Sequence, residues 1–511
     1  MAVQRRSLSV LLSMLIALGL ASALRGSAQS DSPDLQLQRG RTLYGEGRYS
    51  AALTAFVEAA RADVPAIRSP AQIGVVQAAL RLGEFDLARS TAVALRLERP
   101  SDPGVISLYG DAMWSAGLFE EAREAYANAA ALNPDEARSH NGLAKVLAAK
   151  VRYTEALDQA LTAVRLAPQE PDFSSTLGAT YQRMGRYQEA SAEFERFLTL
   201  LPKAKQDDRA LVARSTITSL RSYGREVPNR MAGSPDAVHV LPFRLSDEKI
   251  MVTGRINGGA EIQLVIDTGA ELATVSLVAA GRYRVTPIAL TVSAGVGEIG
   301  VRGLQIGRID SLELGSLRVQ NVPCIIKTPA LADLPTAERE SISPLALGLS
   351  MAVDYRKRTI TLARHLPADA ARADETMSLW MTRLATVRGM VGDQHPRSFA
   401  VDTGGQVISI STDTAKALPT IPGAPRIALK VYGASGWDRD AYLLQGVNLS
   451  FNDIHINQTS VVVINLRAPS VLLGYDLGGI VGHQFLSKYH VSFDLEKAEL
   501  RLRKPDTAPS F

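Results

Sequence analysis

Two copies of the tripeptide Asp-Thr-Gly, at residues 267–269 and 402–404, are the part of the sequence best suited to chemistry. Each follows an apolar run, residues 262–266 in the first copy and 398–401 in the second, and such a run predicts a buried strand. A carboxylate at the end of a buried strand is costly unless chemistry or a partner requires it there. Asp267 and Asp402 are therefore the candidate catalytic residues.

The surroundings of the two tripeptides repeat as well. The interval from Asp267 to Gly348 is almost the same as the interval from Asp402 to Gly482, and each glycine lies within an apolar segment. Matching segments also lie between them, at residues 312–319 and 447–454. The sequence therefore contains an internal duplication.

The spaced pair of motifs resembles the aspartic peptidase family of retropepsins and pepsins, over roughly residues 240 to 505. The resemblance implies two all-β, retropepsin-like (acid protease) lobes, at residues 239–365 and 379–505, with a linker at residues 366–378. It makes Asp267 and Asp402 the catalytic pair. It also implies that the threonines hydrogen-bond across the lobe interface and that the glycines leave room and supply N–H groups. These supporting residues are Thr268, Gly269, Thr403 and Gly404.

Two carboxylates that share one proton are able to hydrolyse a peptide bond without a metal ion or a covalent nucleophile. Like charges ~4 Å apart repel by roughly 4 kcal/mol at an effective dielectric near 20, so double ionisation is disfavoured. The sequence has no H-E-x-x-H and no G-x-S-x-G motif, and its seven histidines form no ligand-spaced cluster. We therefore expect no cofactor and no metal.

A cleft of this kind also needs cover segments that expel water, and residues 294–300 and 432–437 are the candidates. Residues 295–300 also spell G-x-G-x-x-G, but a strand-like pattern follows where a dinucleotide site needs a helix. Two features depart from the family. Gly405 replaces a larger residue, and only six positions separate Gly348 from Asp354, against twelve between Gly482 and Asp494. The helix behind the first loop is therefore expected to be shortened.

Residues 35–222 carry a 34-residue period. Prolines recur at this interval at positions 100, 134, 168 and 202, and alanines at positions 88, 122, 156 and 190. Alanine suits the closest approach of two helices and proline ends the second helix, so these segments resemble tetratricopeptide repeats, of which the second and fourth are least regular. We expect an all-α solenoid with a capping helix at its end, followed by a linker at residues 223–238. The array is either a groove for a peptide or partner protein, or a spacer.

Residues 1–28 read as a signal peptide: Arg5 and Arg6, an apolar stretch, then small residues. They predict export to the periplasm or the extracellular space, with an uncleaved membrane anchor as the alternative. The formal charge of +4 is spread without a basic run, so no nucleic acid is expected to bind. Cys324 is the only cysteine, and its apolar neighbours predict a buried strand thiol.

The sequence thus favours a multidomain, exported aspartic endopeptidase that acts on peptide or protein substrates. The alternative is a non-catalytic scaffold whose lobes grip extended peptides. Because no catalytic constellation precedes the linker at residues 223–238, the helical array is expected to be dispensable for the chemistry.

Overall fold

The computed structural model describes residues 32–202, 208–297, 300–327, 340–392, 395–418, 426–433 and 435–505. They divide after Ala78 into two compact units, which we take in turn. The expected signal peptide at residues 1–28 lies outside the described residues.

The first unit holds helices α2 (Pro33–Gly45) and α3 (Tyr49–Ala59) and most of α4 (Pro65–Leu82). Its core is built around Phe56, which is buried. A Cβ at Gly40 or Gly74 would lie 2.5 or 2.6 Å from the Phe56 ring. The two glycines therefore let both neighbouring helices close onto one aromatic side chain.

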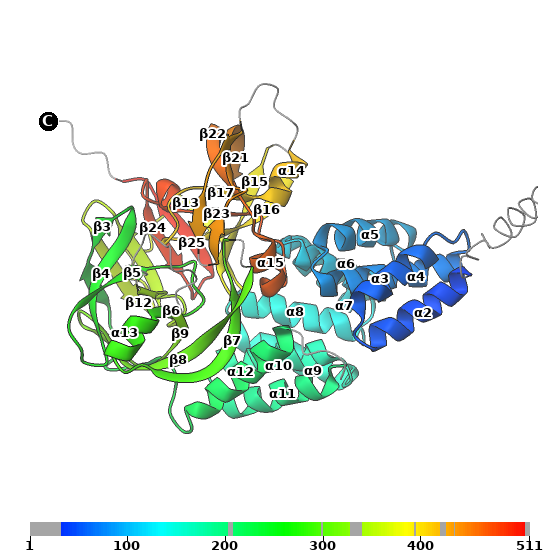
Figure 1. The fold of residues 1–511 in the computed structure, drawn as a ribbon, viewed down its shortest axis with the longest axis horizontal. Helices are drawn as coiled ribbons and strands as arrows, with labels where there is room; N and C mark the ends of the chain where they lie inside the picture. The colour runs from blue at the N-terminus through cyan, green and yellow to red at the C-terminus, as the bar shows by residue number, and fades with distance from the viewer. Residues whose placement is uncertain are drawn as a thin grey trace, which may run out of the picture. The chain divides into compact units, whose positions relative to one another are not determined.

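The second unit begins with antiparallel helix pairs of the same design (Figure 1). The helices are α5 (Phe85–Glu98), α6 (Pro103–Ser115), α7 (Phe119–Leu132), α8 (Ala137–Ala149), α9 (Tyr153–Leu166), α10 (Pro171–Arg183), α11 (Tyr187–Leu200) and α12 (Asp208–Ser222). The periodic alanines of α5, α7, α9 and α11 are all fully buried, as the sequence predicts. The helical solenoid is confirmed, and α12 is the expected final helix.

The turn inside each pair needs a left-handed residue. Gly83, Gly117 and Gly185 fill this position with φ of 69°, 73° and 74°. Val151 stands at the matching position between α8 and α9, with φ of 62°. A β-branched residue is strained in this region, which makes this turn the least favourable of the array.

The first lobe is a sheet with the order β1-β9-β6-β10-β5-β4-β8-β7, in which β3 pairs with β4. Its strands are β1 (Arg230–Met231), β3 (Arg244–Ser246), β4 (Lys249–Ile256), β5 (Ile262–Ile266), β6 (Ala273–Ser276), β7 (Thr286–Ala294), β8 (Val301–Leu314), β9 (Leu317–Lys327) and β10 (Ser341–Ile342), and helix α13 spans Leu277–Arg282. Cys324 is a buried thiol in β9, as expected, and burial raises its pKa to about 12.

The second lobe repeats this plan with the order β14-β15-β16-β23-β17-β22-β21-β18. Its strands are β14 (Trp380–Met381), β15 (Ala385–Val391), β16 (His395–Val401), β17 (Ser409–Ser411), β18 (Ile427–Ala428), β21 (Tyr442–Phe451), β22 (Ile454–Ile464) and β23 (Gly479–Val481). It also holds the hairpin β19 (Val431–Gly433) and β20 (Gly436–Asp438), and helices α14 (Thr412–Ala417), α15 (Arg467–Leu473) and α16 (His483–Leu486).

A third sheet, ordered β13-β25-β24-β11-β12-β2, is shared by both lobes. Its strands are β2 (His239–Pro242), β11 (Ser350–Asp354), β12 (Thr359–Ala363), β13 (Glu375–Ser378), β24 (His490–Asp494) and β25 (Glu499–Arg503). Strand β11 of the first lobe pairs with β24 of the second, with Met351 opposite Phe493. The two lobes therefore share one hydrophobic core, and this fixes their aspartate loops relative to each other. Strands β1 and β13 lie in segments expected to be linkers.

The helical array packs directly on the second lobe. The Phe119 ring lies 5.3 Å from that of Trp380 and 5.1 Å from that of Tyr475. Lys150 Nζ lies 4.2 Å from the centre of the Trp380 ring and donates to the Leu379 carbonyl at 3.0 Å. Burial of these aromatic surfaces makes the array part of the support of the second lobe. That the array is dispensable for the chemistry itself stays a prediction.

Within the part of the chain that the structure describes, no helix combines the length and the apolar character needed to cross a bilayer.

Candidate active site

The two aspartates stand at the ends of matching strands. Asp267 follows β5, which pairs in parallel with β10, and Asp402 follows β16, which pairs in parallel with β23. The Asp267 N–H donates to the Ile342 carbonyl and the Asp402 N–H to the Val481 carbonyl, both at 2.9 Å. Each aspartate backbone is therefore held by the strand behind it.

The threonines lock the two loops together across the lobe interface. The Thr268 N–H donates to Thr403 Oγ1 at 3.1 Å, and the Thr403 N–H donates to Thr268 Oγ1 at 3.0 Å. Each hydroxyl then donates onward, Thr268 to the Val401 carbonyl at 2.6 Å and Thr403 to the Ile266 carbonyl at 2.8 Å. Both side chains are buried, where such bonds contribute most.

The glycines allow the carboxyl groups to face each other. The Gly269 N–H donates to Asp267 Oδ1 at 3.0 Å, and the Gly404 N–H donates to Asp402 Oδ1 at 2.7 Å. A Cβ at Gly269 would lie 2.4 Å from Asp402 Cγ, and one at Gly404 would lie 2.8 Å from Asp267 Cγ. Each loop glycine thus abuts the carboxyl of the opposite lobe, and any side chain there would displace it.

Comparison with sequence families agrees with this geometry. The family described as aspartyl protease matches residues 252–351 and 387–477. Families described as tetratricopeptide repeat match residues 37–104, 109–171 and 175–203. The chain is a tetratricopeptide-repeat protein with an aspartyl-protease domain.

Individual relatives match the repeats. The Hsp70-Hsp90 organizing protein of Triticum aestivum is 37% identical over 93 residues, which is 18% of this chain and 16% of that protein's length. The tetratricopeptide protein TTC0263 of Thermus thermophilus is 26% identical, with a TM-score of 0.31, covering 36% of this chain and 99% of that one. A tetratricopeptide repeat protein from Parabacteroides merdae ATCC 43184 is 17% identical, with a TM-score of 0.30, covering 40% and 77%.

The electrostatics of the protease domain favour a proton on the aspartate pair. Burial raises the pKa of the Asp402 carboxyl from its ordinary value of 3.8 to about 7, and the charge of Asp267, within hydrogen-bonding reach, acts in the same direction. The N–H groups of Gly404 and Gly405 oppose this rise because they stabilise the ionised form. A pair in this setting retains one proton near neutral pH.

The structure corrects the expected shortening of the first lobe. Strand pairing places Ile342 beside Ile266 and Val481 beside Val401, so the counterpart of Gly482 is Ser343 and not Gly348. The Leu347 N–H donates to the Ser343 carbonyl at 3.3 Å, as the Leu486 N–H does to the Gly482 carbonyl at 3.2 Å. Counted from Ser343, the first lobe is therefore not shortened, but residues 344–348 form turns and no helix there corresponds to α16.

The cover segments meet each other in their described parts. The Gly295 N–H donates to Ser435 Oγ, and Ser435 Oγ donates to the Gly300 carbonyl, both at 2.9 Å. The Ser435 N–H donates to the Val296 carbonyl at 2.9 Å. The glycine-rich stretch thus contacts the second lobe. Its described residues do not begin a helix, which a dinucleotide-binding loop would need.

An ion pair that the sequence did not predict joins the two lobes. Glu271, four residues after Asp267, pairs with Arg383 of the second lobe at 2.7 Å, and Arg383 also donates to the Leu472 carbonyl at 2.8 Å. The second lobe has Gln406 at the position matching Glu271. A comparison of the duplicated loops for a charge present in one copy alone is the signal that would have found this pair.

Among the residues that the structure describes, no group of three or more His, Cys, Asp or Glu is placed to hold a metal ion.

Proposed function

We propose that this chain is an aspartic endopeptidase that hydrolyses peptide bonds with a water activated by Asp267 and Asp402. The observation that carries the proposal is the facing pair of carboxyls, each held by its own loop glycine and joined through the reciprocal threonine bonds. A buried pair of acidic groups is costly to fold and suits a reaction that needs one acid and one base.

In the proposed reaction the ionised carboxylate removes a proton from water while the water oxygen attacks the peptide carbonyl carbon. The protonated carboxyl donates to the carbonyl oxygen, which gives a neutral tetrahedral diol. Collapse of the diol breaks the C–N bond, and a proton passes to the leaving nitrogen. The pair is then left with one proton for the next cycle.

The decisive experiment replaces each aspartate separately. Asp267→Asn and Asp402→Asn keep the shape of the side chain but remove the base, so each should abolish cleavage of an unfolded peptide substrate with little change in thermal unfolding. Asp310→Asn, an exposed aspartate on β8, is the matched control and should retain activity.

Mixing the two inactive variants should not restore cleavage, because both loops lie on one chain at high local concentration. Recovery of substantial activity in the mixture would mean that lobes pair between chains. Cleavage by either single variant at the native rate would reject the proposed pair.

The non-catalytic scaffold receives no support of its own, since its argument depended on a shortened first lobe. The helical array is proposed to bind a protein partner or substrate. This role rests on the tetratricopeptide matches at residues 37–104, 109–171 and 175–203.

Export is proposed from the charged start and apolar run within residues 1–28. N-terminal sequencing of the periplasmic or secreted protein should begin between residues 24 and 30. Recovery of an intact Met1 in the membrane fraction would support an anchor instead.

A further inference from the structure

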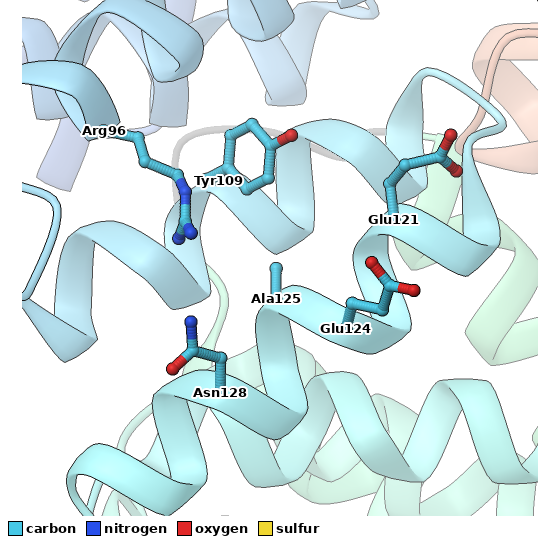
Figure 2. Close-up of a pocket in the computed structure, with 6 residues that line it drawn as sticks. All are labelled: Arg96, Tyr109, Glu121, Glu124, Ala125 and Asn128. Carbon is cyan, nitrogen blue, oxygen red and sulfur yellow. The ribbon is translucent and has the colours of Figure 1, made fainter.

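A cavity of about 230 Å³ opens in the helical array, on the groove between α5 and α7 with α6 behind it (Figure 2). Its lining residues are Arg96, Tyr109, Glu121, Glu124, Ala125 and Asn128. None of them takes part in the proposed peptide hydrolysis.

The cavity has a positive end and a negative end. Figure 2 shows Arg96 and Asn128 at one end, Glu121 and Glu124 at the other, and Tyr109 with Ala125 between them. The electrostatics of Tyr109 reflect both ends. Burial raises its pKa most, Arg96 lowers it, and both glutamates raise it. The charges at both ends of the cavity therefore influence the same side chain between them.

Both ends carry a buried polar atom without a partner. Arg96 Nη1 and Glu121 Oε2 are buried and make no hydrogen bond. The Arg96 guanidinium is held in place over the Tyr109 ring, 5.1 Å from its centre. An unsatisfied buried donor or acceptor of a charged group destabilises a fold, and a ligand that supplies the missing partner gains that free energy on binding.

We propose that this cavity binds a short zwitterionic peptide, with its free carboxylate at Arg96 and its free ammonium at Glu124 and Glu121. The positive and negative side chains at opposite ends suit a ligand that carries both charges, one at each end. A water occupies roughly 30 Å³ of liquid, so the cavity has room for about seven waters, or for a backbone of two or three residues. Extended chain spans about 3.5 Å per residue, so a peptide of three residues holds its two charged termini about 10 Å apart.

The test uses the full-length chain and trialanine, titrated by isothermal calorimetry to about 10 mM peptide. One peptide should bind per chain. N-acetyl-trialanine, which lacks the ammonium, and trialanine amide, which lacks the carboxylate, should each bind at least about tenfold more weakly, because each leaves one charged end unpaired.

Variants test which end of the cavity binds the carboxylate and which end binds the ammonium. Arg96→Gln should remove the penalty for amidation and leave the penalty for acetylation, and Glu124→Gln should do the reverse. Glu124 is varied in preference to Glu121 because its contact with Arg123 is long, at 3.8 Å, whereas Glu121 pairs with Arg388 at 2.8 Å. Arg89→Gln, on the same helix but paired with Asp86, should bind like the native chain. If Arg96→Gln does not fold, Arg96→Lys takes its place. It keeps the charge and should retain part of the preference for a free carboxylate.

Three results would overturn the proposal. They are the absence of trialanine binding, equal binding of the blocked and free peptides, and a carboxylate preference that survives Arg96→Gln. Equal binding would instead fit an internal segment of a partner protein. None of these outcomes depends on cleavage, so the peptidase proposal stands or falls separately.

Discussion

At the scale of residues, the site is a balance between burial and hydrogen bonding. Burial pushes the Asp402 carboxyl toward its protonated form, while the loop N–H groups favour ionisation. The threonine bonds hold the two loops together across the lobe interface, so each carboxyl stays under the electrostatic influence of the other. The acid and the base of the proposed reaction are therefore produced by one environment acting on two identical side chains.

The pH profile follows from this balance. The pKa of Asp402 in the folded chain is about 7, above its ordinary 3.8, so the pair holds a proton in this window and loses it as pH rises through about 7. Cleavage should therefore fall above this pH. The same raised pKa contributes stability that is fully present below 3.8 and is lost as pH rises through about 7.

Two measurements check the predicted loss of activity and of stability with rising pH. The kcat/KM for a peptide should decline above neutral pH, and the free energy of unfolding should fall relative to that of Asp402→Asn as pH increases. A cleavage rate that still rises between about pH 7 and pH 9 would contradict the assignment.

At the scale of elements, the array shows how one repeated turn tolerates an ill-suited residue. The turn before α9 places Val151 at φ of 62°, where the matching turns use glycine. A left-handed conformation costs an L-residue about 1–2 kcal/mol, and packing of the flanking helices must offset it. The fourth repeat is one of the two least regular in sequence, and this strain is its structural counterpart.

Replacing Val151 should therefore stabilise the protein. Val151→Gly relieves the strained turn and, after the entropy cost of glycine, should raise the free energy of unfolding by about 1 kcal/mol in urea titrations. Gly185→Val is the matched reverse change, since a Cβ there meets nothing nearer than Tyr187 at 3.9 Å and only the conformation is affected. It should destabilise by about 1–2 kcal/mol. Equal stabilities of all three chains would mean that the turn stores no strain.

At the scale of the whole molecule, the helical array contacts and supports the second lobe of the protease domain. Strand β15 lies beside β16, which ends at Val401 just before Asp402, and Arg388 of β15 pairs with Glu121 of the array at 2.8 Å. The Asp476 N–H donates to the Ser115 carbonyl at 2.7 Å, next to the Phe119 contact with Tyr475. A partner bound to these helices would thus act close to the strands that hold the site.

The aromatic contact is open to a direct test. Phe119→Ala removes a buried ring and its packing on Trp380 and Tyr475, and should lower the free energy of unfolding by about 3–5 kcal/mol. Leu161→Ala, at a side chain with 43% exposure on α9, should change it by less than about 0.5 kcal/mol. Indistinguishable urea midpoints for the two variants would show that the array does not support the second lobe.

The sequence by itself determined the features that local pattern encodes. A 34-residue period specifies paired helices, and an apolar run ending in Asp-Thr-Gly specifies a buried strand with a tight loop. The fold class of the lobes and the meeting of Asp267 with Asp402 were implied by the resemblance to aspartic peptidases that two such loops in matching contexts carry.

Tertiary structure alone decided what depends on residues far apart in the chain. Strand register made Ser343 the counterpart of Gly482, because register is set by the backbone pairing of β5 with β10 and of β16 with β23, and not by residue identity. The Glu271–Arg383 pair and the Phe119 contact join side chains on different lobes and domains, so the sequence around one member does not specify the other member. Such contacts arise only when separate surfaces are packed together, so their partners are chosen by shape and charge across space and not by spacing along the sequence.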